Sequence, residues 1–227
     1  MNKTALEIRH LHVWHNQKPI IQDFNISAKQ GETVALVSSS KDLQLSLLDG
    51  LLGLNTERQG SIRIHETESI HLAAQNVPHL GLALCSKETG LAFALTCEEN
   101  LLLPLVGHSL GGGLSLTEIY DLFPLLAQYK EAPCTRLSPG EQQLLALARV
   151  LRTGADIIVL HDLHADFCPA IQTTATTLLK KLKERGYTLI LNESNKPFAA
   201  SLADRLYCIN NGKAHLYQVH HKHPISA

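Results

Sequence analysis

Residues 137–149 combine the signals of a helix start with those of an anion-binding site. Ser138 is a good helix N-cap, Pro139 suits the first helical position, and Glu141 follows the serine at capping-box spacing. Apolar residues then recur at helical spacing up to Arg149. The free N–H groups of such a helix start, together with the serine hydroxyl, can bind a phosphate. A well-capped structural helix would carry the same residues, so both interpretations stay open here.

A second set of chemistry-bearing side chains directly follows a short apolar run at 155–160. His161, Asp162, His164 and Asp166 are residue types that bind Zn²⁺. Their close spacing along one strand end and the following loop argues against a common metal centre. We therefore predict no metal site.

These residues need a scaffold of alternating strands and helices to position them. Mostly apolar runs at 33–37, 80–85, 155–160 and 187–191 are typical of central parallel strands. Alternating or apolar patterns also predict strands at 6–14, 24–28 and 60–65, and an Asn211-Gly212 turn predicts a hairpin within 203–213. Helical patterns cover 45–54, 117–126 and 169–185, Thr96 suits a helix cap, and the polar tail around 220–223 should fray. The order predicts an α/β fold with a parallel sheet.

Composition excludes several classes of protein. The chain has 227 residues, 44% of them hydrophobic, and a formal net charge of −1, which gives no electrostatic case for binding nucleic acid. There is no apolar run of membrane-spanning length and no signal-peptide pattern at the start. The five cysteines lack metal-ligand spacing, which is typical of reduced cytosolic thiols.

From end to end the chain resembles the ATP-binding subunit of ABC transporters, most nearly the branched-chain amino-acid importer type. Three stretches carry the resemblance: Leu-Ser-Pro-Gly-Glu-Gln at 137–142, Val-Ala-Leu-Val at 34–37, and Leu-Leu-Asp-Gly-Leu-Leu-Gly at 47–53. The resemblance implies a P-loop NTPase-like core with a parallel central sheet, an antiparallel β subdomain and a helical subdomain. It implies one domain over 1–227, with the core at about 1–86 and 145–227 and the helical subdomain at about 87–144.

The family's phosphate-binding loop departs most from its pattern in this chain. Where the family has Gly-x-x-Gly-x-Gly-Lys-Ser/Thr, residues 38–45 read Ser-Ser-Ser-Lys-Asp-Leu-Gln-Leu. Ser38, Lys41 and Leu43 replace the glycines that let backbone N–H groups approach phosphate. Gln44 stands at the position of the phosphate-binding lysine, and Leu45 at that of the hydroxyl that binds Mg²⁺.

The other family positions that hold or hydrolyse ATP also differ. Lys87 fills the place of the glutamine that senses the γ-phosphate, and His161 that of the aspartate that binds Mg²⁺. Asp162 stands at the catalytic glutamate and Ser194 at the switch histidine, while His15 aligns with the aromatic residue that stacks on adenine.

The resemblance therefore predicts a catalytically degenerate subunit with no intact catalytic residue, a pseudo-ATPase that holds no nucleotide alone. In the family two cassettes pair head to tail, so Ser138, Gly140 and Glu141 would contact ATP and Mg²⁺ held by an intact partner subunit. Pro139 departs from the family's glycine at this motif. The other expected partners are transmembrane permease subunits, at the cytoplasmic face of the membrane and without insertion into it. Two alternatives stay open: a non-catalytic regulatory module that binds no nucleotide, and an active transport ATPase with atypical motifs.

Overall fold

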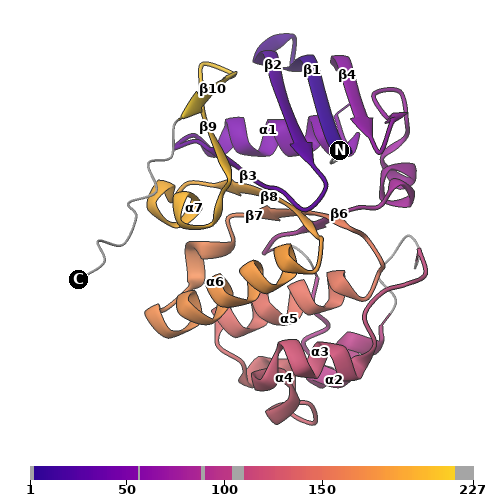
Figure 1. The fold of residues 1–227 in the computed structure, drawn as a ribbon, viewed down its shortest axis with the longest axis vertical. Coiled ribbons are helices and arrows are strands. Elements are labelled where there is room, and N and C mark those ends of the chain that lie inside the picture. Colours follow the sequence, from indigo (N-terminus) through magenta and orange to yellow (C-terminus); the bar gives the residue numbers. More distant parts are fainter. Residues whose placement is uncertain (1–2, 56, 88–89, 104–109, 218–227) are drawn as a thin grey trace.

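The computed structural model describes residues 3–55, 57–87, 90–103 and 110–217, and Figure 1 shows its fold. The predicted polar tail at 220–223 lies outside these residues.

The central sheet has six strands in the order β10-β9-β3-β8-β7-β6. Five of them are parallel: β3 (Thr33–Val37), β6 (Leu82–Cys85), β7 (Ile157–His161), β8 (Thr188–Glu193) and β9 (Arg205–Asn210). β10 (Lys213–Tyr217) returns antiparallel to β9 through the predicted two-residue turn, in which Asn211 and Gly212 both have positive φ. The predicted parallel α/β sheet is confirmed.

A second, antiparallel sheet has the order β2-β1-β4-β5. Its strands are β1 (Thr4–His15), β2 (Lys18–Lys29), β4 (Arg58–Ile64) and β5 (Thr67–Glu68). Its register is interrupted near His10, which has positive φ, and Gly60 opposite lies against the His10 carbonyl. This sheet is the predicted antiparallel β subdomain.

The helices form layers on the two faces of the central sheet (Figure 1). α1 (Lys41–Leu52) lies between the two sheets, while α5 (Pro139–Leu151), α6 (Pro169–Glu184) and α7 (Lys196–Leu202) cover the other face. Three short helices lie at the end of the molecule opposite the antiparallel sheet, namely α2 (Cys97–Leu102), α3 (Leu116–Leu122) and α4 (Pro124–Gln128). Turns of 3-10 helix occur at Ala74–Leu80, Cys134–Arg136 and Leu163–Asp166.

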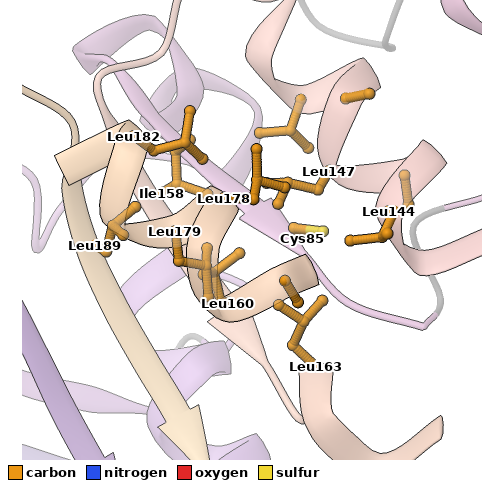
Figure 2. Close-up of a cluster of buried hydrophobic side chains, with 14 of the residues drawn as sticks. Cys85, Leu144, Leu147, Ile158, Leu160, Leu163, Leu178, Leu179, Leu182 and Leu189 are labelled. Carbon is orange, nitrogen blue, oxygen red and sulfur yellow. The ribbon is translucent and has the colours of Figure 1, made fainter. Parts of the chain in front are cut away.

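Strand alternation divides the buried side chains into two cores. Val34 and Leu36 of β3 pack toward α1 and the antiparallel sheet, whereas Ala35 and Val37 pack toward α5 and α6. Figure 2 shows part of the second core, where leucines of α5 and α6 meet the apolar side chains of β6 and β7. Both faces of the sheet are covered, which explains why its strands read as unbroken apolar runs.

Two predicted helices differ from the structure. α1 begins at Lys41, one turn before the predicted start at residue 45, because Ser40 caps it and Asp42 favours the first turn. The predicted helix at 117–126 is two helices, because a proline at 124 lacks the N–H that a continuous helix would need.

Candidate functional site

The candidate site lies where β3, β7 and β8 end at the same edge of the sheet. Three segments meet there: the loop after β3, His161 at the end of β7 with Asp162 after it, and residues 192–194 at and just after the end of β8. In open α/β sheets, ligands bind in crevices at the carboxyl ends of the strands. The sheet therefore brings Gln44, His161, Asp162 and Ser194 to one edge.

The loop after β3 is only three residues long. The Ser38 N–H donates to the Glu193 carbonyl at 3.2 Å, and the Ser40 N–H donates to Ser38 Oγ at 3.1 Å. Ser40 Oγ in turn accepts from the Leu43 N–H at 3.4 Å, which caps α1. Residues 41–43 are thus the first turn of a helix, and an exposed carboxylate, Asp42, already occupies its positive end.

Gln44 is turned into the protein rather than toward a ligand. Its side chain is buried, with Nε2 donating to the Ser38 carbonyl at 3.0 Å. The backbone carbonyl of Gln44 accepts a hydrogen bond from Asn192 Nδ2 at 3.1 Å, which connects α1 to the end of β8. Leu45, the next residue, presents an apolar side chain that is 47% exposed.

The residues after β7 make weak polar contacts with the end of β8. Asn192 Nδ2 lies 3.4 Å from His161 Nδ1, and Ser194 Oγ donates to Asp162 Oδ1 at 3.3 Å. Asp162 adopts a left-handed backbone conformation with φ +48°, which aspartate tolerates better than most residues. In the described part of the chain, no three histidine, cysteine or acidic side chains gather as a metal would need.

Glu193 was not among the residues that sequence reasoning selected, yet it links the loops around this site. Its buried carboxyl accepts through Oε1 from the N–H groups of Leu163 at 2.8 Å and His164 at 3.3 Å. Burial raises the pKa of Glu193 to about 8, and the charge of Asp162 adds to the increase. A polar Asn-Glu pair ending an apolar strand was the signal in the sequence.

These contacts do not fit Mg²⁺-ATP. A bound phosphate needs several N–H donors that point to one place, together with a cation. In this chain the side-chain amide of Gln44 donates to the Ser38 carbonyl instead, and Asp42 adds a negative charge to the loop. The buried Asn192 Oδ1 has no hydrogen-bond partner among the described residues, and as an acceptor it would oppose an anion. Leu45 offers no oxygen to a metal.

The second candidate site surrounds the start of α5. The Ser138 N–H donates to Glu141 Oε2 at 2.7 Å and the Glu141 N–H donates to Ser138 Oγ at 3.4 Å, which completes the predicted capping box. Ser138 and Pro139 are exposed, whereas Gly140 is buried. A Cβ at Gly140 would lie 3.1 Å from the Asp166 carbonyl oxygen, so a larger residue would push the two segments apart by a few tenths of an ångström.

Lys87 belongs to this second site rather than to the first. Its Nζ lies 2.7 Å from Asp166 Oδ2, beside a cleft of about 400 Å³ between α5 and the loop after β6. Asp166, Gln143, Leu91 and Phe93 also line this cleft.

His15 lies apart from both groups, exposed at the end of β1. It interacts with Asp49 near the far end of α1, where burial raises the pKa of Asp49 and the His15 charge opposes the increase. The neighbouring Trp14 stacks on His12 with ring centroids 5.7 Å apart.

Comparison with known proteins places this geometry among nucleotide-binding subunits of transporters. Residues 21–163 match the family described as ABC transporter. The chain is 28% identical over 201 residues to the high-affinity branched-chain amino acid transport ATP-binding protein BraG of Pseudomonas aeruginosa, covering 85% of this chain and 83% of that protein. It is 27% identical to the thiamine import ATP-binding protein ThiQ of Photorhabdus laumondii, covering 86% and 83%.

Solved structures confirm the predicted fold. A dimeric ATP-binding cassette in a post-hydrolysis state, bound to ADP and Pi, superposes with a TM-score of 0.79 at 19% identity, covering 94% of this chain and 98% of that one. The ADP conformation of another ATP-binding cassette of an ABC transporter gives 0.78 at 18% identity, covering 93% and 89%. Within the described residues, no helix has the length and apolar character needed to cross a bilayer.

Proposed function

Because the chain belongs to the ABC transporter family, we propose that it is a cassette subunit of a transporter that binds no Mg²⁺-ATP in its own loop. It pairs with an intact cassette subunit and with permease subunits, at the cytoplasmic face of the membrane. ATP and Mg²⁺ are held by the loop of the partner, and Ser138 at the start of α5 contacts that nucleotide. The hydrolysis chemistry is supplied by the partner.

The observation that carries this proposal is the contrast between the two candidate sites. The loop after β3 is closed by Gln44, which bonds to the Ser38 carbonyl, and by the first turn of α1. The start of α5 instead keeps an exposed serine at a helix N-terminus, where the Glu141 carboxylate is bound back to the Ser138 N–H in the capping box. If the chain had lost its function and worked without a partner subunit, there would be no physical reason for the start of α5 to keep this geometry.

Calorimetry of the chain alone tests the first part of the proposal. We expect no heat of binding with Mg²⁺-ATP at millimolar concentration, because Gln44 replaces a charge-assisted bond worth about 1.5–3 kcal/mol with an internal one. A micromolar dissociation constant would instead support an active ATPase with atypical motifs.

Two substitutions of Ser138 test the contact with the nucleotide of the partner. Both Asp and Asn are good N-caps, so Ser138→Asp and Ser138→Asn each preserve the start of α5. Only the aspartate places a negative charge where the phosphates would approach, and we expect turnover of the co-purified heterodimer to fall at least tenfold in that variant. The asparagine variant, as matched control, should stay within about threefold of the parent. A bulky residue at Gly140 would be a poorer test, because Gly140 is packed against Asp166.

A non-catalytic regulatory module is the second candidate, and two observations favour it. Pro139 has no N–H to offer a phosphate, and Gly140 is covered by residues of its own chain. Equal turnover in complexes carrying Ser138, Ser138→Asp and Ser138→Asn would establish this second function in place of the first.

A further inference from the structure

Asp166, in the 3-10 turn after β7, contacts the start of α5 and the loop after β6 at once. Its Oδ2 accepts from Lys87 Nζ at 2.7 Å and from Gln143 Nε2 at 3.2 Å. Its carbonyl oxygen lies 3.1 Å from the position that a Cβ of Gly140 would take. One residue therefore packs on the first turn of α5 and bonds to the second.

The side-chain amide of Gln143 donates to Asp166 but leaves its own oxygen without a hydrogen bond to any residue that the structure describes. Gln143 is only 5% exposed, and its Oε1 has no hydrogen-bond partner among the described residues. An unpaired buried acceptor is unfavourable, so the orientation of this side chain is set by the bond that Nε2 donates to Asp166. The contact therefore constrains the second turn of α5 more than a surface ion pair alone would.

The loop after β6 is tied to α5 from the other side as well. Arg149, which is buried in the last turns of α5, donates from Nη1 to the Gly90 carbonyl. The side chain of Lys87 thus attaches this loop to the 3-10 turn, and the carbonyl of Gly90 attaches it to α5.

We propose that Asp166 is a positioning residue that holds the first two turns of α5, and with them Ser138, in a fixed orientation against the loop after β6. This inference rests on the proposed function, because the orientation matters for turnover only if Ser138 contacts the nucleotide of a partner. Lys87 stands at the position where the family senses the γ-phosphate. In this chain it forms an ion pair with Asp166 instead.

Amide hydrogen exchange of the full chain, without a partner, tests the positioning directly. In Asp166→Ala we expect the amides of residues 141–146 to exchange about five- to tenfold faster, with the exchange of β7 and β8 unchanged. Lys87→Met should give a smaller acceleration, because the bond to Gln143 remains. Asp121→Asn on α3 and Lys180→Met on α6 change exposed residues of the same types and serve as matched controls. Unchanged exchange at 141–146 in Asp166→Ala would overturn the proposal.

Turnover with the partner, normalised to assembled heterodimer, provides the second readout. Asp166→Ala should lower kcat about tenfold and leave KM for ATP within about twofold, because the partner's loop holds the nucleotide. Asp166→Asn keeps an oxygen that can accept from Gln143 Nε2, and its turnover should stay within about threefold of the parent. Full turnover of Asp166→Ala in a complex that Ser138→Asp inactivates would overturn the positioning role. If neither Asp166→Ala nor Ser138→Asp changes turnover, the proposed function is wrong. The hydrogen-exchange result alone then decides whether Asp166 holds α5 in place.

Discussion

The buried carboxyl of Glu193 should make the stability of this protein depend on pH. Its pKa is raised from 4.5 to about 8, chiefly by burial at the end of β8. Below pH 4.5 the carboxyl is protonated in both the folded and the unfolded chain, so its contribution to stability is fully present. As the pH rises toward 8, the unfolded chain loses the proton while the folded chain keeps it, and the free energy of unfolding falls by about 1.4 kcal/mol per pH unit.

Glu193→Gln removes this dependence and should stabilise the chain at high pH. The interval from 4.5 to about 8 corresponds to an upper limit of about 5 kcal/mol. The glutamine keeps the acceptor for the N–H groups of Leu163 and His164, but its own Nε2 would take the place of the unpartnered Oε2. Since an unpaired buried donor costs about 1–3 kcal/mol, we expect a net gain of about 2–4 kcal/mol at pH 8.

Urea unfolding at pH 5.5, 6.5, 7.5 and 8.5 measures the effect. The parent chain should lose stability steeply across this series relative to Glu193→Gln, with the two curves crossing near the acidic end. Glu184→Gln, at the exposed end of α6, is the control and should follow the parent. Parallel curves for parent and Glu193→Gln would refute the reasoning, because the carboxyl would then be ionised in the folded state.

Three further outcomes follow from particular contacts. Gln44→Lys should not restore ATP turnover in the isolated chain, because the first turn of α1 still fills the loop; a phosphate-release assay measures this, and recovered turnover would contradict it. Gly60→Ala should lower the free energy of unfolding by about 3 kcal/mol or more, since its Cβ would lie 2.4 Å from the His10 carbonyl oxygen at φ +123°; a midpoint in urea equal to the parent's would count against this. A maleimide should label the exposed Cys168 in the folded chain but Cys85 only after unfolding, because burial raises the pKa of Cys85 to about 12; peptide mapping by mass spectrometry distinguishes the two.

The sheets could be predicted from the sequence because burial on both faces leaves an unbroken apolar run, as at Thr33–Val37 and Ile157–His161. The Asn211-Gly212 hairpin and the Ser138 capping box could be predicted because each depends only on neighbouring residues. The start of α1 differs from the prediction because the Ser40 cap begins the helix before the apolar pattern that starts at Leu45.

Contacts between distant segments could not be predicted in this way. The buried orientation of the Gln44 side chain depends on its hydrogen bond to the Ser38 carbonyl. It also depends on the bond from Asn192, which lies on another strand, to the Gln44 backbone carbonyl. The pair of Lys87 with Asp166 likewise joins segments that only the folded sheet brings together. The resemblance assigned His161 and Asp162 to one site, but it gave no reason to select Glu193, whose importance comes from its burial.

The first turn of α1 makes the loop after β3 difficult to change by single mutations. The three helical residues before Gln44 advance the helix by about 4.5 Å, and Ser40 caps its start. A glycine at Lys41 or Leu43 would each cost the helix up to about 1 kcal/mol, without yet providing a cradle for phosphate. A lineage moving toward a glycine-rich loop would pass through less stable chains that gain nothing at each step. The helix turn therefore makes a glycine-rich loop hard to reach by single substitutions, whatever sequence surrounds it.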